Sequence, residues 1–237
     1  MTKQNHPEIR PSSVFRELEI ISGYASNSML SIIPTADIGS TTMIEKAILV
    51  ALIKIVNPLS IFEFGTFRGE TSHLFLENTS DNVKVYTCDL PSPLDQNKNL
   101  GEYNILNAAE NDQYLTHFRH NNLIPAFLSS IKKNKNRFTQ ISCNSMSLDT
   151  NALPKFDFIF VDGGHTPELV FNDTQKAFRM LSSKGVIVWH DYNSPIHTAV
   201  TDFIDNFVPE SPYRIFTIKG TSLAISVDSD LLAKFLQ

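Results

Sequence analysis

Glycine and cysteine are both scarce in this chain. Among its 237 residues there are 9 glycines and 2 cysteines, Cys88 and Cys143. Two cysteines cannot build the network of disulfides that holds small secreted domains together. We therefore expect both thiols to be reduced and packed in the core, and the protein to be cytoplasmic. With so few glycines, the positions that they do occupy become informative.

Long apolar runs and a basic surface are also missing. The longest apolar run, ILVALI at residues 48–53, is far shorter than the roughly 20 residues that span a membrane. The first residues, MTKQNHPEIRPSS, hold no apolar segment of the kind found in signal peptides. The formal net charge is −5, and the one lysine-rich stretch, IKKNKNR, is predicted to be a solvated helix end. We expect neither a membrane nor a nucleic acid as a partner.

The chain is long enough, and apolar enough at 42% hydrophobic residues, to bury a sizeable core. Residues 8–56 are predicted to be helical, apart from a polar loop near 34–41. The clearest signal is the capping box of Thr42 and Glu45, which opens the apolar stretch MIEKAILVALIKIV before Asn57-Pro58 ends it. We assign residues 1–57 to an N-terminal helical arm and residues 58–237 to the main domain.

From residue 59 onward, short apolar runs alternate with helical patterns. The predicted strands are LSIFEF, VKVYTCDL, RFTQISCN, FDFIFVDG and GVIVWHD, and helices are predicted at TSHLFLEN and after the Thr166-Pro167 start signal. This alternation predicts a doubly wound parallel sheet. The final YRIFTIKGTSLAISV reads as a hairpin, which adds an antiparallel edge. Residues 91–125 exceed an ordinary connection and are predicted to be an insertion or lid.

A glycine loop follows the first predicted strand, in FEFGTFRGETS. Gly65 and Gly69 would let the backbone approach a ligand at the start of a helix. The dinucleotide fingerprint needs a glycine where Glu63 stands, so the loop alone is equally typical of a tight turn. Asp89, at the end of the second predicted strand, is placed to accept hydrogen bonds from ribose hydroxyls, or else to form a turn before Pro91. Together the two acids favour an adenosine-type ligand with a positively charged part.

The order of five segments resembles class I S-adenosylmethionine-dependent methyltransferases, and more narrowly the methyltransferase-24 group. The segments are FEFGTFRGETS, VYTCDLP, FDFIFVDGGHTPELVFNDTQKAF, LSSKGVIVWHDY and IKGTSLAI, within residues 59–227. The resemblance implies a Rossmann-like sheet of seven strands with an antiparallel last strand. Two departures stand out: Cys143-Asn144-Ser145 replaces a frequent Gly-Asp-Ser triplet, and Lys184-Gly185 replaces a double glycine.

The same resemblance implies S-adenosyl-L-methionine as the cofactor. It places Glu63, Gly65 and Gly69 at the methionine part, Asp89 at the ribose and Ser145 at the adenine. The full set of residues implied to bind the cofactor is Glu63, Gly65, Thr66, Phe67, Arg68, Gly69, Thr71, Ser72, Asp89, Leu90, Asn144, Ser145, Asp162 and Gly163.

The segments VDGGH and WHDY follow strands that are expected to be neighbours. Asp162, His165, His190 and Asp191 should therefore meet at the carboxyl edge of the sheet. As in some related O-methyltransferases, Asp162, His190 and Asp191 could ligate Mg²⁺ or Mn²⁺, and the ion would lower the pKa of a substrate hydroxyl. Alternatively His190 or His165 acts as the general base with an aspartate such as Asp162 as its partner. In the third alternative these residues only brace the loops.

The sequence thus predicts an S-adenosylmethionine-dependent O-methyltransferase that acts on a small hydroxylated acceptor, such as a sugar or a secondary metabolite. A metal-assisted hydroxylase on the same fold and a non-catalytic cofactor-binding subunit are the alternatives. In the insertion, an aromatic stripe either covers the acceptor or packs as core; it comprises Tyr103, Tyr114 and Phe118, with Arg119 beside it. The apolar helix over 42–56 is expected to pack on the sheet or on a second copy of the chain, so homo-oligomerisation is left open.

Overall fold

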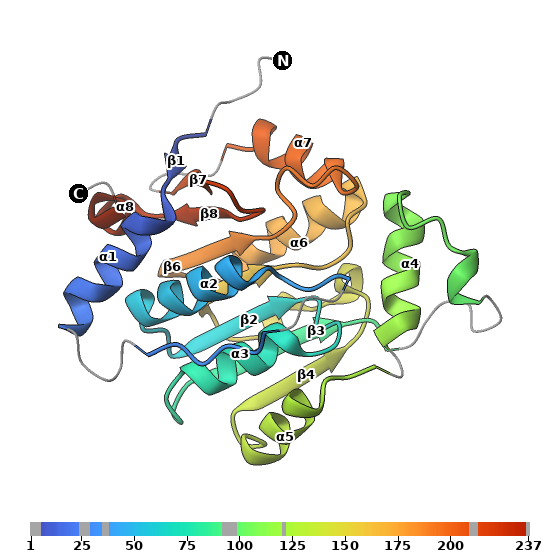
Figure 1. Cartoon of the computed structure of the whole chain (residues 1–237), viewed down its shortest axis with the longest axis horizontal. Coiled ribbons are helices and arrows are strands. Elements are labelled where there is room, and N and C mark those ends of the chain that lie inside the picture. The colour runs from blue at the N-terminus through green and yellow to red at the C-terminus, as the bar shows by residue number, and fades with distance from the viewer. Residues whose placement is uncertain are drawn as a thin grey trace.

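The computed structural model describes residues 6–23, 29–34, 38–91, 99–119, 122–208 and 213–235. Within these ranges a single mixed sheet is flanked by helices on both faces (Figure 1). The strands are β1 (Glu8–Ile9), β2 (Ser60–Phe64), β3 (Lys84–Asp89), β4 (Phe138–Ser142), β5 (Phe156–Val161), β6 (Leu181–Trp189), β7 (Arg214–Ile218) and β8 (Ala224–Val227). The helices are α1 (Pro11–Ser22), α2 (Met43–Val56), α3 (Glu70–Asn78), α4 (Ala108–Arg119), α5 (Pro125–Lys133), α6 (Pro167–Met180), α7 (Thr198–Asn206) and α8 (Ser229–Phe235).

The strand order is β1-β7-β8-β6-β5-β2-β3-β4. Strands β6, β5, β2, β3 and β4 are parallel, and β8 runs antiparallel to both β6 and β7. The predicted doubly wound fold, with its antiparallel last strand, is confirmed. The structure adds β1, which pairs with β7 in parallel. A strand of two residues is too short to show the period-two alternation by which strands are recognised in a sequence.

The two faces of the sheet bury different side chains because successive strand residues point in opposite directions. On β2, Ile61 belongs to the core beneath α1, α2 and α3, whereas Phe62 and Phe64 belong to the core beneath α6 and α7. All three side chains are fully buried. Strand β6 already begins at Leu181, which pairs with Phe156, rather than at the predicted start, Gly185.

Helix α2 begins as the sequence predicts. Thr42 accepts a hydrogen bond from the Glu45 backbone N–H at 3.4 Å, and Glu45 accepts one from the Thr42 N–H at 2.8 Å. Residues 48–53 of α2 are at most 1% exposed and belong to the same core as the sheet. The helix therefore packs on the sheet within this chain.

The predicted helical arm is wrong in two places. Residues 8–9 form β1, and residues 29–34 run without helical structure; residues 1–5, 24–28 and 35–37 of the arm lie outside the described ranges. The side chain of Asn78 explains the second difference, because it accepts a hydrogen bond from the Ser31 N–H at 2.8 Å and donates one to the Ser31 carbonyl at 2.7 Å. The backbone is thus satisfied without a helix.

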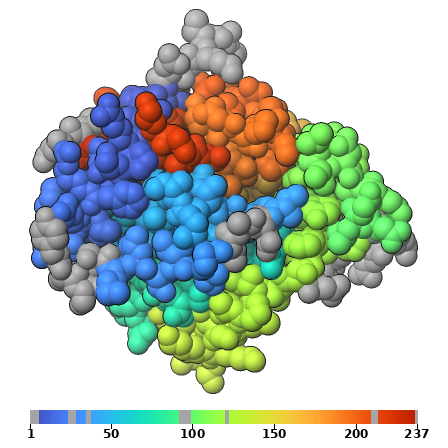
Figure 2. Space-filling view, in the orientation of Figure 1, coloured from blue at the N-terminus to red at the C-terminus, as the bar shows by residue number. Residues whose placement is uncertain are grey.

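The predicted insertion folds mainly into α4, which stands across the carboxyl ends of the parallel strands in Figure 1. Figure 2 shows the green residues of this segment as a lobe beside the orange residues around α7. Residues 92–98 and 120–121 of the insertion lie outside the described ranges. Among the residues that are described, no helix is long and apolar enough to cross a membrane.

Candidate active site

A cavity of about 350 Å³ opens at the carboxyl ends of the parallel strands. Its walls come from the loops after β2, β3, β4, β5 and β6, from residues 38–40 and from α4. The volume lies within the range of small-molecule sites, about 300–1,000 Å³. The place is the one at which open α/β sheets bind ligands, because neighbouring loops diverge there.

The glycine loop forms one wall of the cavity, and its geometry requires glycine at position 65. Gly65 has φ +86°, and a Cβ atom there would lie 2.0 Å from the Asp162 carbonyl oxygen. The next residues turn their backbone N–H groups toward Asp89: the amides of Thr66 and Phe67 donate to Asp89 Oδ2 at 3.0 and 2.9 Å. Phe67 itself has φ +44°, a left-handed conformation that is uncommon for a bulky residue.

A residue of the insertion also contacts Asp89. Arg119 at the end of α4 forms an ion pair with the Asp89 carboxylate and donates to the Leu90 carbonyl. The second carboxylate oxygen, Oδ1, accepts from the Leu90 N–H at 2.7 Å. The acid predicted to bind ribose therefore lines the cavity, where the glycine loop and α4 meet.

Glu63 lies beneath the glycine loop and does not line the cavity. It is 1% exposed and accepts a hydrogen bond from Ser72. Burial raises the pKa of Glu63 well above its usual range, and the nearby Asp162 and Asp89 add to the rise, against the lowering by Ser72. The carboxyl group thus braces the start of α3 through Ser72.

The predicted cofactor residues divide into two sets. The first set lines the cavity and consists of Gly65, Phe67, Asp89, Leu90, Asn144, Ser145, Asp162 and Gly163. The second set supports it from behind and consists of Glu63, Thr66, Arg68, Gly69, Thr71 and Ser72. Among the second set, Arg68 donates to the Asn122 carbonyl at 2.6 Å and so ties the loop to the segment after α4.

Sequence reasoning missed Lys176, which shapes the wall opposite the glycine loop. From α6 its ammonium group donates to the Met146 and Leu148 carbonyl oxygens, both at 2.9 Å. Lys176 therefore holds the turn that carries Ser145, although a lysine at a helical position gives no signal of this in the sequence. Cys88 and Cys143 also line the cavity as free thiols, with their Sγ atoms 3.6 Å apart.

The predicted polar cluster does form at the rim. Val161 of β5 pairs with Trp189 of β6, so the next residues, Asp162 and His190, emerge side by side. His190 Nδ1 lies 3.2 Å from Asp162 Oδ1 and 3.2 Å from Asp191 Oδ2. Its other nitrogen, Nε2, lies 3.5 Å from Glu45 Oε2 at the start of α2.

These carboxylates control the charge of His190. Burial alone would lower its pKa, but Asp162 and Asp191 raise the pKa of His190 well above its usual range. The protonated form of the side chain is therefore favoured while the acids surround it. In this state His190 is a donor rather than a base.

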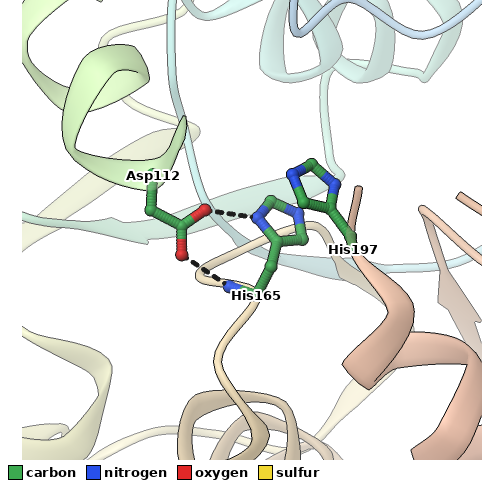
Figure 3. Close-up of side chains that lie close together, drawn as sticks. All are labelled: Asp112, His165 and His197. Carbon is green, nitrogen blue, oxygen red and sulfur yellow. Dashed lines mark hydrogen bonds and ion pairs between the residues drawn. The ribbon is translucent and has the colours of Figure 1, made fainter. Parts of the chain in front are cut away.

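His165 lies beside this group and contacts an acid that sequence reasoning missed. Asp112 of α4 accepts from the His165 backbone N–H at 2.8 Å through Oδ2, and its Oδ1 lies 2.5 Å from His165 Nδ1 (Figure 3). On the other side of the ring, Nε2 lies 2.9 Å from Asp191 Oδ2. Burial opposes protonation, but these two acids raise the pKa of His165 to about 10.

His197, at the start of α7, completes the cluster. Its ring stacks on the His165 ring with centroids 3.6 Å apart and an interplanar angle of 7°. Figure 3 shows the two imidazoles face to face beside Asp112. The sequence analysis assigned no role to His197 or Asp112, because neither lies in a strand-end segment.

The aromatic stripe of the insertion packs against itself and against the glycine loop, and two of its rings, Tyr114 and Phe118, are only half-buried. Tyr114 stacks on Phe118, Phe118 stacks on Phe67 of the glycine loop, and Tyr103 packs edge-on to Tyr114. None of these three insertion aromatics lines the cavity. The cavity is instead lined by the other face of α4, at Asn111, Asp112, Leu115, Thr116 and Arg119.

Comparison with known proteins supports the class that fold and site define. The model of a methyltransferase domain family, the methyltransferase-24 group, matches residues 62–192. The SAH-bound methyltransferase PaMTH1 from Podospora anserina has a similar fold, with a TM-score of 0.57 at 12% identity over 94% of this chain and 91% of that one. An O-methyltransferase from Bacillus cereus in complex with SAH gives 0.55 at 15% identity, over 92% and 91%. No curated protein matches in sequence.

The sheet order, the glycine loop and the acid after β3 together define a class I methyltransferase fold. The chain belongs to the methyltransferase-24 family, whose model covers more than half of it. The predicted family, fold and enzyme class, an S-adenosylmethionine-dependent methyltransferase, are thereby confirmed.

Proposed function

We propose that the protein transfers a methyl group from S-adenosylmethionine to a hydroxyl of a small acceptor, such as a sugar or a secondary metabolite. One observation carries this proposal: a single cavity of about 350 Å³ joins Asp89, the acid suited to ribose, to the rim of acids and imidazoles at Asp162, His165 and His190. The two neighbours described above were solved with SAH bound.

The residues of the chain fit such a cofactor. Gly65 leaves the loop backbone open where a Cβ atom would collide with Asp162. Asp89 Oδ1 and Oδ2 accept backbone N–H groups and face the cavity, where they can also accept from ribose hydroxyls. When bound, the cofactor supplies an electrophilic sulfonium methyl group. The chain must then place the acceptor oxygen in line with that methyl and exclude water.

Helix α4 supplies the exclusion of water. It lies over the cavity with Leu115 and Thr116 in the wall, and it is joined to the core at Asp89 and at His165. The acceptor oxygen gains the methyl group and loses its proton, so a proton acceptor must stand near it. His165 and His190 both stand at the rim, and we propose that His165 takes this proton once it has lost its own, because the acids beside it raise the pKa of His165 to about 10. Asp112 and Asp191 would hold the ring in place.

Metal assistance is the second part of the proposal. Asp162 and Asp191 supply oxygen donors for a divalent cation, and their oxygens both lie 3.2 Å from His190 Nδ1, which would have to lose its proton to act as a ligand. Asp162, His190 and Asp191 would hold Mg²⁺ or Mn²⁺, which when bound would lower the pKa of the acceptor hydroxyl. We also propose that the protein is cytoplasmic and that the chain self-associates.

Calorimetric titration with S-adenosylmethionine tests the proposal, first with EDTA and then with added Mg²⁺ or Mn²⁺. We expect saturable binding near one cofactor per chain, with Gly65→Ala abolishing it. Gly220→Ala is the matched control, because Gly220 also has positive φ but has nothing within 4 Å of the added Cβ. Absence of binding in all conditions would contradict the proposal. Turnover of acceptors only with metal would support the role of Asp162, His190 and Asp191.

The same protein sample can be used to distinguish methyl transfer from the hydroxylase alternative. A methyltransferase converts the cofactor to S-adenosylhomocysteine in proportion to methylated acceptor. A hydroxylase would instead need an oxidising co-substrate and would add oxygen to the acceptor. Mass spectrometry of the product, a gain of a methyl group or of an oxygen atom, decides between them.

A further inference from the structure

Three metal-ligating side chains from three separate segments meet beside the proposed catalytic rim. Asp112 comes from α4, His165 from the loop after β5 and His197 from the residue that precedes α7. Each offers one ligand atom, and these atoms lie within 4.8 Å of one another. Figure 3 shows the three side chains turned toward one another.

The two imidazoles of this cluster pack face to face in a buried, acidic setting. His165 and His197 are each 7% exposed, yet their rings stack at 3.6 Å among acidic side chains. Two protonated rings at this distance would repel each other, and burial of a charged group is unfavourable unless it is paired. A protonated His165, with an N–H on each ring nitrogen, accounts for its contacts to Asp112 and Asp191 but gives no reason for a second imidazole.

His197 is incompletely satisfied within the described part of the chain. Its Nε2 lies 3.2 Å from Asn111 Oδ1, while its buried Nδ1 has no hydrogen-bond partner. Asp191 Oδ1 is 3.1 Å from that Nδ1 without forming a hydrogen bond of normal geometry. Buried polar atoms are usually satisfied, so such an atom at a cluster of donors points to a missing partner.

We propose that Asp112, His165 and His197 bind a first-row transition-metal ion of the Zn²⁺, Mn²⁺ or Co²⁺ type. Two imidazoles and one carboxylate are the donors that such ions prefer over the all-oxygen sets that suit Mg²⁺. The ion takes the place of the proton between His165 and Asp112, and the stacked rings tilt to direct one nitrogen each at it. A fourth position remains open to water or to Asn111.

This site is distinct from the set Asp162, His190 and Asp191 proposed above. None of its three side chains belongs to that set, although His165 Nε2 lies 2.9 Å from Asp191 Oδ2, and Asp112 belongs to the insertion. An ion here would therefore bind α4 to the loop after β5 and to the start of α7. The inference can be tested on the cofactor-free protein. While such an ion is bound, His165 is a metal ligand and the acceptor proton has to pass to another group.

Titration of the purified, metal-free chain with Co²⁺ provides the test, because imidazole-ligated Co²⁺ gives visible absorption bands. We expect one saturable phase of Co²⁺ binding at the nitrogen-rich site; any ion held by Asp162, His190 and Asp191 would add a second, separate phase. His197→Gln and Asp112→Asn should each weaken this binding at least about 10-fold, since loss of even an outer-shell partner commonly weakens metal binding by about 10–100-fold. Two separate variants guard against a folding defect in one, and circular dichroism checks both.

Two control variants define the location. Asp162→Asn removes an oxygen donor of the other set, and His117→Gln removes an imidazole from α4 that does not line the cavity. Both should leave the Co²⁺ affinity within about threefold of the unchanged chain, well below the 10-fold effect of a lost partner. The proposal is overturned if the unchanged chain shows no saturable binding up to millimolar Co²⁺. It is equally overturned if His197→Gln and Asp112→Asn bind normally, or if Asp162→Asn abolishes binding.

Discussion

Several residues at the rim of the cavity adopt backbone conformations that side chains usually avoid. Phe67, Asp191 and Asn193 have φ of +44°, +62° and +62°. Aspartate and asparagine tolerate this region better than bulky residues do, and Phe67 is held there by the hydrogen bond from its own N–H to Asp89. Such local strain is common at ligand sites, because the surrounding structure fixes the geometry that the ligand needs.

One residue-scale prediction concerns Asp173 on α6, which lines the cavity near Ser145. Burial raises the pKa of Asp173 to about 6 from 3.8, against the lowering by hydrogen bonds with Ser145 and Asn172. A carboxyl group with a raised pKa binds its proton more tightly in the folded state, so stability falls as the pH rises from about 4 through 6.

Asp173→Asn removes this pH dependence. Between pH 4 and pH 8, we expect the variant to gain up to about 3 kcal/mol of unfolding free energy relative to the unchanged chain, at about 1.4 kcal/mol per pKa unit. Urea unfolding at several pH values measures the difference. Parallel stability curves for the two proteins would show that Asp173 titrates normally in the folded state.

At the scale of elements, α4 joins the two halves of the proposed site. Its C-terminal Arg119 pairs with Asp89 on the cofactor side, and Asp112, two turns earlier, contacts His165 on the acceptor side. Because a helix moves as one rigid body, the contacts of Arg119 and Asp112 together fix the position of α4. Its attachment to the glycine loop depends on Phe118, which stacks on Phe67 and lies beneath the Arg68 guanidinium at 5.7 Å.

We therefore expect Phe118→Ala to loosen α4 without unfolding the sheet. Aromatic pairs contribute about 0.5–1.5 kcal/mol beyond area burial, so local opening should become several-fold more frequent. Limited proteolysis should cut residues 99–119 faster, while the melting temperature of the core changes little. Leu106→Ala is the matched control, since Leu106 is 76% exposed in the same insertion. Equal cleavage rates in both variants would contradict the role of Phe118.

At the scale of the whole molecule, the N-terminal residues are part of the main core. Ile9, Val14 and Leu18 are at most 6% exposed, and they pack with the sheet residues on the α2 face. Helix α1 contacts both α2 and α8, and β1 extends the sheet beside β7. Elements near the two ends of the chain, α1 with α8 and β1 with β7, thus pack together on one side of the fold, as Figure 1 shows.

Removal of residues 1–22 should destabilise the protein strongly. Exposure or loss of three buried aliphatic side chains corresponds to roughly 4–9 kcal/mol, at about 1.5–3 kcal/mol each. Denaturant unfolding gives the stability, and light scattering of both proteins gives the mass in solution. An unchanged unfolding midpoint would contradict the prediction. An unchanged mass would show that these residues are not needed for any self-association.

The sequence by itself determined the existence of every strand except β1, the starts of α2 and α6, and the edge of the sheet at which the candidate site lies. The apolar pattern of a strand can be recognised from its own few residues. The Thr42–Glu45 capping box and the Thr166-Pro167 start signal each act within one helical turn. The pairing of Val161 with Trp189 then follows from the parallel sheet, which is why Asp162 and His190 could be placed together in advance.

Only the tertiary structure decided which other side chains reach that rim. Asp112, Arg119, Lys176 and His197 lie on helices or at their ends, at positions where polar residues are ordinary. Their convergence depends on how α4, α6 and α7 pack, which no local pattern encodes. The same packing surrounds His190 with Glu45, Asp162 and Asp191 and so sets its charge. The sequence specifies that residue 190 is a histidine, but the protonation state of His190 also depends on Glu45 and Asp162, which are distant along the chain.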